Sequence, residues 1–160
     1  MLQIVPAQSE EAISQARRLF REYASARDVA PCVEDFEREV STLPGAYAPP
    51  SGRLLLAIHE STENAMEAIG CGALRKLQQD VCEMKRLYVR PAFRGHGAGY
   101  RLVEELLMEA RSIGYARMVL DTLPTMDKAH KLYRSLGFRE IPAYWNNPIP
   151  GVLFFELTLI

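Results

Sequence analysis

The sequence has no hydrophobic run long enough to cross a membrane. Its apolar stretches fall well short of the roughly 18 residues that a spanning helix needs. The first twenty residues show no basic segment followed by an apolar one, so no secretory signal is predicted. A formal net charge of −1 gives no overall attraction to nucleic acid or to an anionic membrane. We therefore expect a cytoplasmic protein whose partners are neither membranes nor nucleic acids.

Cysteine and histidine are scarce, with three of each in 160 residues. Cys32, Cys71 and Cys82 form no CxxC pair, and their odd number favours free thiols in a reducing compartment. The histidines show neither an HExxH pattern nor a Cys/His spacing typical of a metal site. The sequence thus predicts no metal.

Sequence motifs of several enzyme classes are also missing. There is no GxxxxGK[ST] phosphate loop and no GxSxG nucleophile elbow. A GxGxxG dinucleotide fingerprint starting at Gly95 fails, because Tyr100 stands where the last glycine is required. These absences exclude the P-loop nucleotide-triphosphatase and dinucleotide-binding motifs and an elbow-type serine nucleophile.

The residues that are present predict one α/β domain over residues 1–160. Hydrophobic residues make up 48% of the chain and charged residues 24%, which is typical of a globular protein. Apolar periodicity predicts helices over residues 9–26, 33–43, 100–114 and 125–136, and strands over residues 2–5, 53–60, 68–77, 81–89, 116–122 and 152–159. Ser9 is expected to cap the first helix and Gly114 to end the third. A strand–helix–strand crossover from residue 81 to 122 predicts a parallel strand pair.

The segment VRPAFRGHGAG, residues 89–99, joins a predicted strand to a predicted helix. Gly95, Gly97 and Gly99 alternate there, and such glycines let a ligand approach the backbone closely. The unpaired N–H groups and the dipole at the start of a helix favour an anion such as phosphate. Basic residues crowd the junction: Lys85, Arg86, Arg90, Arg94, His96 and Arg101. A tight structural turn beside a solvated basic face is the alternative.

The string from Arg94 to Gly99 fits the pattern R/Q-x-x-G-x-G/A, which resembles the pyrophosphate-binding loop of the GNAT superfamily of acyl-CoA-dependent N-acyltransferases. EMKRLYV resembles the fourth strand of that fold, RMVLDT its fifth, and AHKLYRSLGF its last helix. The resemblance covers residues 81–138 and implies a GNAT-like domain, with a mixed central β-sheet flanked by helices on both faces. It implies acetyl-CoA as cosubstrate and an amine as acceptor. The cofactor-binding residues that it implies are Leu87, Tyr88, Val89, Arg94, Gly95, His96, Gly97, Ala98 and Gly99.

Two side chains match catalytic positions of the family. Tyr133 matches a tyrosine that faces the cofactor sulfur, and a phenol with a pKa near 10 can protonate a thiolate. Its place in an apolar helical stripe equally suits a core tyrosine. Glu83 lies where several relatives carry the glutamate that accepts the amine proton, directly or through water; a solvated strand glutamate paired with Lys85 or Arg75 is the alternative. Met126 departs from the family, which often has asparagine there, so that cofactor contact is not carried over.

The acceptor site is expected near two loops. AYWNNPIPG offers Trp145 and Asn146, and YAPPSGR offers Tyr47 and Arg53. Loops made rigid by proline are the alternative interpretation. The resemblance also implies that the thioester carbonyl meets a backbone N–H near Leu87 or Val89. The hypothesis is an N-acetyltransferase, for which a homodimer is one alternative. Its rival is a non-catalytic module that binds or senses acyl-CoA.

Overall fold

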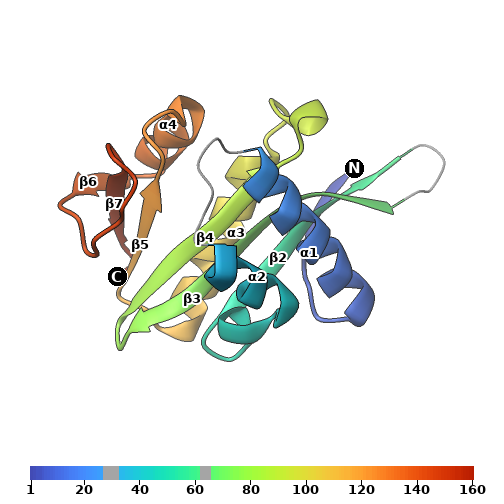
Figure 1. The fold of residues 1–160 in the computed structure, drawn as a ribbon, viewed down its shortest axis with the longest axis horizontal. Coiled ribbons are helices and arrows are strands. Elements are labelled where there is room, and N and C mark those ends of the chain that lie inside the picture. The colour runs from blue at the N-terminus through green and yellow to red at the C-terminus, as the bar shows by residue number, and fades with distance from the viewer. Residues whose placement is uncertain (27–32, 62–65) are drawn as a thin grey trace.

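A mixed sheet with helices on both faces forms the molecule (Figure 1). The computed structural model describes residues 1–26, 33–61 and 66–160. Cys32 and residues 62–65, which join the strands predicted over 53–60 and 68–77, lie outside the described residues. The sheet has seven strands in the order β1-β2-β3-β4-β5-β7-β6. The strands and helices, with two short 3₁₀ turns, are β1 (Leu2–Pro6), α1 (Glu10–Ser25), α2 (Val33–Ser41), η1 (Gly45–Tyr47), β2 (Arg53–Glu60), β3 (Met66–Gln78), β4 (Val81–Val89), η2 (Pro91–Phe93), α3 (Ala98–Ile113), β5 (Arg117–Thr122), α4 (Asp127–Ser135), β6 (Arg139–Ile141) and β7 (Leu153–Thr158).

The predicted helix caps are confirmed. The Ser9 hydroxyl accepts a hydrogen bond from the Ala12 N–H at 3.1 Å, which satisfies one of the free donors of α1. Gly114 ends α3 with φ 108°, a left-handed conformation that favours glycine. Of the strands, β6 was not predicted, because three residues are too few to show an alternating pattern.

Each face of the sheet carries its own hydrophobic core. One core packs α3 and the Tyr133 ring of α4 against the sheet through residues such as Leu102 and Leu106. The other packs α1 and α2 against the opposite face, with Phe20 and Phe36 among its members. A sheet covered on both faces is held rigidly, so irregularities within it persist as fixed features.

The main irregularity is a gap between β4 and β5. These strands are parallel, as predicted, but pair only where Val81, Cys82 and Glu83 face residues 117–119. Beyond Glu83 they separate, as Figure 1 shows, while β4 stays paired with β3 and β5 with β7. The β5-facing edge of β4 from Met84 to Val89 therefore has no strand partner.

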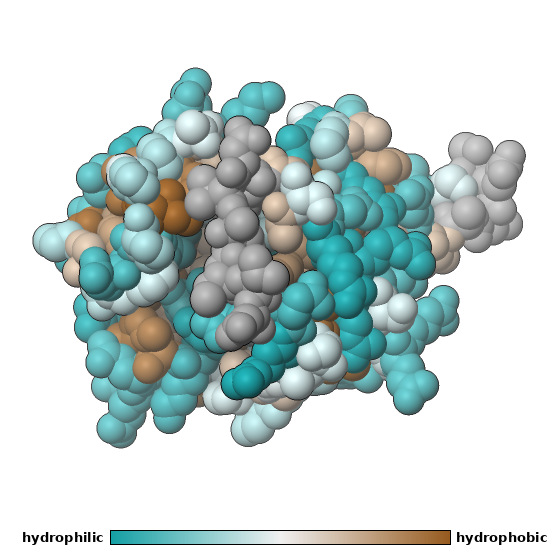
Figure 2. All heavy atoms as spheres, viewed as in Figure 1, coloured by the Kyte–Doolittle hydropathy of each residue, from teal (hydrophilic) through white to brown (hydrophobic). Residues whose placement is uncertain are grey.

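The surface on the side of α1 and α2 is mainly hydrophilic (Figure 2). The exposed large hydrophobic side chains are scattered over different elements: Met1, Met66, Leu77, Tyr100, Met108, Trp145 and Ile160. Among the described residues, no helix has the length and apolar character of a membrane span.

Candidate functional site

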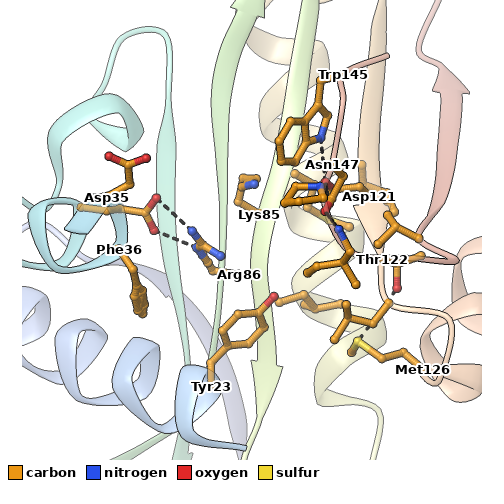
Figure 3. A pocket seen from close by; sticks show the side chains of 18 of the residues that line it. Tyr23, Asp35, Phe36, Lys85, Arg86, Asp121, Thr122, Met126, Trp145 and Asn147 are labelled. Carbon is orange, nitrogen blue, oxygen red and sulfur yellow. Dashed lines mark hydrogen bonds and ion pairs between the residues drawn. The ribbon is translucent and has the colours of Figure 1, made fainter. Parts of the chain in front are cut away.

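A cavity of about 390 Å³ lies at the gap between β4 and β5 (Figure 3). Residues from both faces of the sheet line it: Tyr133 of α4 lies on one face, and Tyr23 of α1 and Phe36 of α2 lie on the other. The remaining lining residues come from α2, β4, β5 and the two segments after β5 and β6: Asp35, Glu39, Met84, Lys85, Arg86, Leu87, Leu120, Asp121, Thr122, Leu123, Met126, Trp145, Asn147, Pro148, Ile149 and Val152. The gap thus passes through the sheet and joins its two faces.

The glycine loop lies between β4 and the start of α3. Gly95 and Gly97 both have φ +87°, and a Cβ added at either would meet no protein atom within 4 Å. Conformation, and not lack of space in the free protein, is therefore what requires glycine at these positions. No hydrogen bond among the described residues uses the backbone N–H groups of residues 95–100. Six free donors at the positive end of a helix suit an anionic ligand.

Arg94, which is exposed, holds the start of this loop against the end of β4. Its Nε donates to the Val89 carbonyl at 2.8 Å, and its guanidinium lies 5.7 Å from the centre of the Tyr88 ring. His96 is exposed, and Ala98 is buried at the first position of α3. The predicted cofactor residues from Leu87 to Gly99 therefore form one continuous stretch, of which Leu87 also lines the cavity.

Tyr133 belongs both to the core and to the cavity wall. It is 5% exposed, and its ring centre lies 5.7 Å from that of Phe138 and 6.0 Å from that of Phe155. The two interpretations of this tyrosine are thus compatible, because packing fixes a ring that also reaches the cavity. Met126 lies on the same wall, where its sulfur accepts a hydrogen bond from the Thr122 hydroxyl at 3.9 Å.

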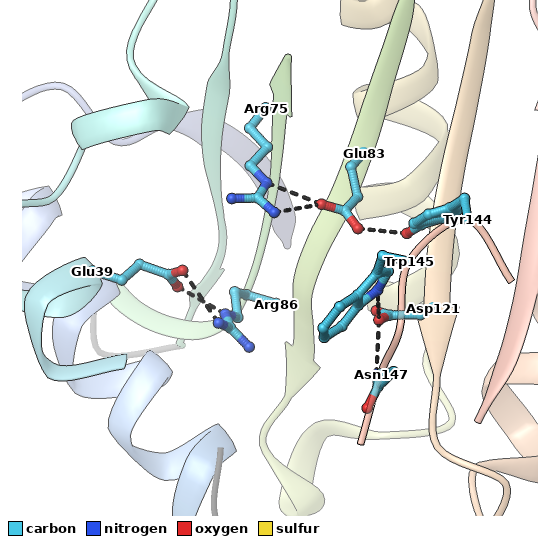
Figure 4. Close-up of polar contacts among 8 residues, drawn as sticks. All are labelled: Glu39, Arg75, Glu83, Arg86, Asp121, Tyr144, Trp145 and Asn147. Carbon is cyan, nitrogen blue, oxygen red and sulfur yellow. Dashed lines mark hydrogen bonds and ion pairs between the residues drawn. The ribbon is translucent and has the colours of Figure 1, made fainter. Parts of the chain in front are cut away.

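Glu83 is buried where the gap begins (Figure 4). It is 1% exposed, and its Oε1 accepts a hydrogen bond from Arg75 Nε at 2.9 Å and lies 2.8 Å from Arg75 Nη2 in an ion pair. Its Oε2 accepts from the Tyr144 hydroxyl. Burial and the charge of Glu83 raise the pKa of Tyr144 well above its ordinary value, so the phenol stays protonated and donates. Glu83 does not line the cavity, and neither does Tyr144.

The segment between β6 and β7 closes one wall of the cavity. Trp145 Nε1 donates to Asp121 Oδ2 at 2.8 Å, and Asn147 Nδ2 donates to the same oxygen at 3.1 Å (Figure 4). Of the two residues that the sequence analysis assigned to the acceptor site here, Trp145 lines the cavity and Asn146 does not. Asn147, the residue after Asn146, also lines it. Sequence analysis found the segment but missed Asp121, Tyr144 and Asn147, since no local pattern indicates their pairing.

Tyr47 and Arg53 lie away from the cavity. Tyr47 is 2% exposed and packs edge-on against Phe20 with ring centres 6.2 Å apart. The Arg53 Nε donates to Glu109 at 2.7 Å, and its Nη1 donates to the carbonyls of Pro50 and Gly52. Since neither lines the cavity, we do not carry them into the acceptor site.

Arg86 is a cavity residue that sequence analysis did not assign to the acceptor site. The register of β3 against β4 shifts beside it, and it adopts φ 62°, which is uncommon for a residue other than glycine. Its Nε and Nη2 donate to Glu39 at 2.8 and 3.2 Å. The rings of Tyr23 and Phe36 lie 5.7 and 5.2 Å from the guanidinium carbon. These contacts fix a cation in the cavity wall.

The described cysteines are not placed for chemistry. Cys71 and Cys82 are free and buried, and burial raises the pKa of both thiols, that of Cys82 to about 12. A thiol with so high a pKa is a poor nucleophile at neutral pH. No group of three or more histidine, cysteine or acidic residues that could hold a metal occurs in the described part of the chain.

Comparison with known proteins identifies the family. The model of the acetyltransferase (GNAT) family matches residues 13–138. The chain belongs to the GNAT acetyltransferase family. An uncharacterized N-acetyltransferase of Schizosaccharomyces pombe is 37% identical over 144 residues, which cover 89% of this chain and 86% of the relative.

Solved GNAT structures share the fold. An acetyltransferase of the family from Staphylococcus aureus has a TM-score of 0.79 at 17% identity, covering 100% of both chains. A GNAT acetyltransferase from Elizabethkingia anophelis, solved with acetyl-CoA bound, has a TM-score of 0.68 at 22% identity and covers 99% of this chain and 98% of that one. These likenesses confirm the fold class predicted from the glycine loop and the C-terminal motifs.

Proposed function

We propose that this GNAT protein transfers an acetyl group from acetyl-CoA to a primary amine of a small molecule or peptide. The observation that carries the proposal is the gap between β4 and β5, which joins a run of free backbone N–H groups to a cavity lined by Tyr133 and by charged side chains of β4 and β5. Acetyl-CoA bound to the Elizabethkingia family member supports the choice of cosubstrate. The homodimer remains a proposal as well.

Coenzyme A would be held by backbone groups more than by side chains. The N–H groups of residues 95–99 would receive the pyrophosphate, with Arg94 and His96 beside them. The pantetheine amides would pair with the unpartnered edge of β4 near Leu87, Tyr88 and Val89, as an added strand does. Bound in this way, coenzyme A would extend from the glycine loop along β4, and its thioester would lie in the cavity.

The transfer requires one bond to form and one to break. The amine nitrogen attacks the thioester carbonyl, and a backbone N–H of the free β4 edge, near Leu87 or Val89, would stabilise the oxyanion. The C–S bond then breaks, and the Tyr133 hydroxyl would protonate the departing thiolate. The amine loses a proton to a base, and the acetylated amine and free coenzyme A result.

Glu83 is the proposed base, and its surroundings set a condition on that role. Its carboxylate is buried between Arg75 and Tyr144 and does not line the cavity. Because Tyr144 does not line the cavity either, the amine proton would reach Glu83 through water, with or without the Tyr144 hydroxyl as a further relay. In the Tyr144 path the phenol passes its own proton to Glu83 as it receives one, so it never becomes a phenolate.

Thiol release from acetyl-CoA in the presence of an amine panel tests the function. We expect release that depends on the amine, with a product heavier than the amine by one acetyl group. Thermal stabilisation by acetyl-CoA without amine-dependent release would favour the rival, a non-catalytic acyl-CoA-binding module. If acetyl-CoA neither stabilises the protein nor releases thiol with any amine, the proposal is refuted.

A further inference from the structure

We propose that the acceptor is a zwitterion, an amino acid or similar molecule that carries a carboxylate near its amine. Its carboxylate would lie at Lys85 and Arg86 and its ammonium at Asp121. The inference rests on the proposed function, because it names the acceptor class of the same cavity. The positions and contacts of Lys85, Arg86 and Asp121, and the balance of charge around them, support it.

Lys85 and Asp121 lie on the same face of the sheet, on opposite sides of the gap. On β4, Cys82 and Met84 enter the core beneath α3, so Lys85 points to the opposite face. On β5, Met118 and Leu120 enter that same core, so Asp121 also points away from it. Both line the cavity (Figure 3).

Lys85 is a cation without a compensating anion. It is half-buried, and among the described residues it makes neither an ion pair nor a hydrogen bond. By contrast, Arg75 of β3, Arg86 of β4 and Arg90, which follows β4, each contact a carboxylate within 4.0 Å. A substrate carboxylate is the group that Lys85 lacks.

Arg86 provides a second hydrogen-bond donor beside Lys85, and its side chain is held rigidly. Its Nε and Nη2 donate to Glu39, which leaves Nη1 with no hydrogen bond to any described residue. Its backbone conformation and the two flanking rings hold the guanidinium in place. A side chain fixed in this way loses little conformational entropy when it binds a ligand. Such a contact suits a carboxylate, which accepts hydrogen bonds from two cations at once.

Asp121 keeps one carboxylate oxygen available. Trp145 and Asn147 both donate to Oδ2, and no described residue donates to Oδ1. Because both donors are neutral, the negative charge of Asp121 is not cancelled. That charge and the free oxygen suit an ammonium group at the entrance to the gap.

The balance of charge favours a zwitterion over other amines. The charged lining residues on this face are Asp35, Glu39, Lys85, Arg86 and Asp121. Glu39 and Arg86 neutralise each other, and solvent screens the charge of Asp35, which is exposed on α2. Lys85 and Asp121 remain as one positive and one negative charge. A polyamine would meet the cation Lys85, and an amine without a carboxylate would leave it unpaired.

Kinetics on matched acceptors test the inference. Amine-dependent thiol release would be measured for the twenty common amino acids and for the carboxamide of each, which keeps the amine and removes the negative charge. We expect kcat/KM of the preferred amino acid to exceed that of its amide by about 10- to 100-fold, the worth of a hydrogen bond to a charged group. Lys85→Met should remove this preference by lowering kcat/KM for the acid only.

Two further variants complete the design. Lys76→Met changes an exposed lysine of β3 outside the cavity and should leave both substrates unaffected. Asp121→Asn should lower kcat/KM for acid and amide alike, mainly through KM, because both carry the ammonium. Equal rates for acids and amides in the wild type, or an equal loss of both in Lys85→Met, would overturn the inference.

Failure of the proposed function gives a different result. In that case no amine of any kind causes thiol release. The acceptor class is then read from thermal stabilisation by the same acids and amides in the presence of coenzyme A. A larger shift for acids that Lys85→Met abolishes would support the inference, and equal shifts would overturn it.

Discussion

At the scale of single residues, the site combines side chains that have a structural partner with side chains that have none. Glu83, Arg86 and Tyr133 are each fixed by buried contacts, whereas Lys85 and one oxygen of Asp121 face the cavity without a partner among the described residues. Fixed groups can be held in the geometry that a reaction needs, and unpartnered charges are available to a substrate.

Tyr133→Phe separates packing from proton transfer. The ring stays between Phe138 and Phe155, so we expect only a small change in melting temperature. Loss of the proton donor should lower kcat and kcat/KM together by about 10²- to 10⁴-fold, with acetyl-CoA affinity nearly unchanged. Single-turnover kinetics are required, since slow product release would hide the chemical step. Turnover within a few-fold of wild type would make Tyr133 a core residue only.

Glu83→Gln should change the pH dependence of the reaction. A base matters most where the acceptor is an ammonium ion, so the loss in rate should be largest at low pH and shrink as pH rises toward the pKa of the amine. Affinity for acetyl-CoA should stay the same, because Glu83 lies away from the glycine loop. The pH–rate profile of kcat/KM measures this effect.

Tyr144→Phe is the matched control for that profile. It removes the hydroxyl next to Glu83 and keeps the carboxylate and Arg75. If the proton passes through Tyr144, this variant reproduces the Glu83→Gln profile. A profile in Glu83→Gln that parallels the wild type at every pH would leave Glu83 with a purely structural role.

At the scale of elements, the two ends of α3 offer a direct comparison. Gly97 and Gly114 flank the helix, both have positive φ, and neither has a protein atom within 4 Å of an added Cβ. Substitution by alanine should therefore impose a similar backbone strain at each end. Only Gly97 belongs to the proposed pyrophosphate loop.

Gly97→Ala should weaken acetyl-CoA binding, whereas Gly114→Ala should not. We expect both variants to lose a few degrees of melting temperature, of order 1 kcal/mol of stability. Calorimetric titration with coenzyme A should show at least a tenfold weaker Kd for Gly97→Ala alone, because its methyl group and altered backbone disturb the anion-binding N–H groups. Equal affinities in the two variants would remove the loop from the cofactor site.

At the scale of the whole molecule, one buried carboxylate, that of Glu156, forms ion pairs that join three strands of the sheet. Glu156 of β7 accepts from Arg117 of β5 at 2.7 Å and from Arg139 of β6 at 3.3 Å. The hydrogen bond from Arg117 lowers the pKa of Glu156, and Arg139 adds to this while burial opposes it. A lowered pKa means that Glu156 stabilises the fold above its unfolded pKa of about 4.3, and that this stabilisation is lost as pH falls through the folded value.

Glu156→Gln should therefore lower the melting temperature at pH 7 more than at pH 3. Glu140→Gln is the control, because Glu140 pairs with Arg134 at 3.4 Å with both side chains more than half exposed, and such pairs contribute little. Thermal melts of the three proteins at both pH values provide the measurement. A deficit of Glu156→Gln that does not shrink on acidification would contradict this role.

The sequence predicts most of the fold because the fold depends on local patterns. Apolar periodicity, the Ser9 cap and the glycine at 114 indicate elements directly, and only β6 is too short for such a signal. The glycine loop is equally local. The acceptor cavity is not: Tyr144 meets Glu83 across 61 positions, and Arg86 meets Glu39 across 47. Long-range pairs of this kind, and the register shift at Arg86, arise only when the sheet is assembled.

A crystal structure with acetyl-CoA tests the central claim most directly. The pyrophosphate should accept hydrogen bonds from the backbone N–H groups between Gly95 and Gly99, with the pantetheine along the free edge of β4. The thioester sulfur should lie within hydrogen-bonding reach of the Tyr133 hydroxyl, and its carbonyl should face the cavity that holds Lys85 and Asp121. A cofactor bound outside the gap between β4 and β5, or a thioester directed away from Tyr133, would contradict the proposed mechanism.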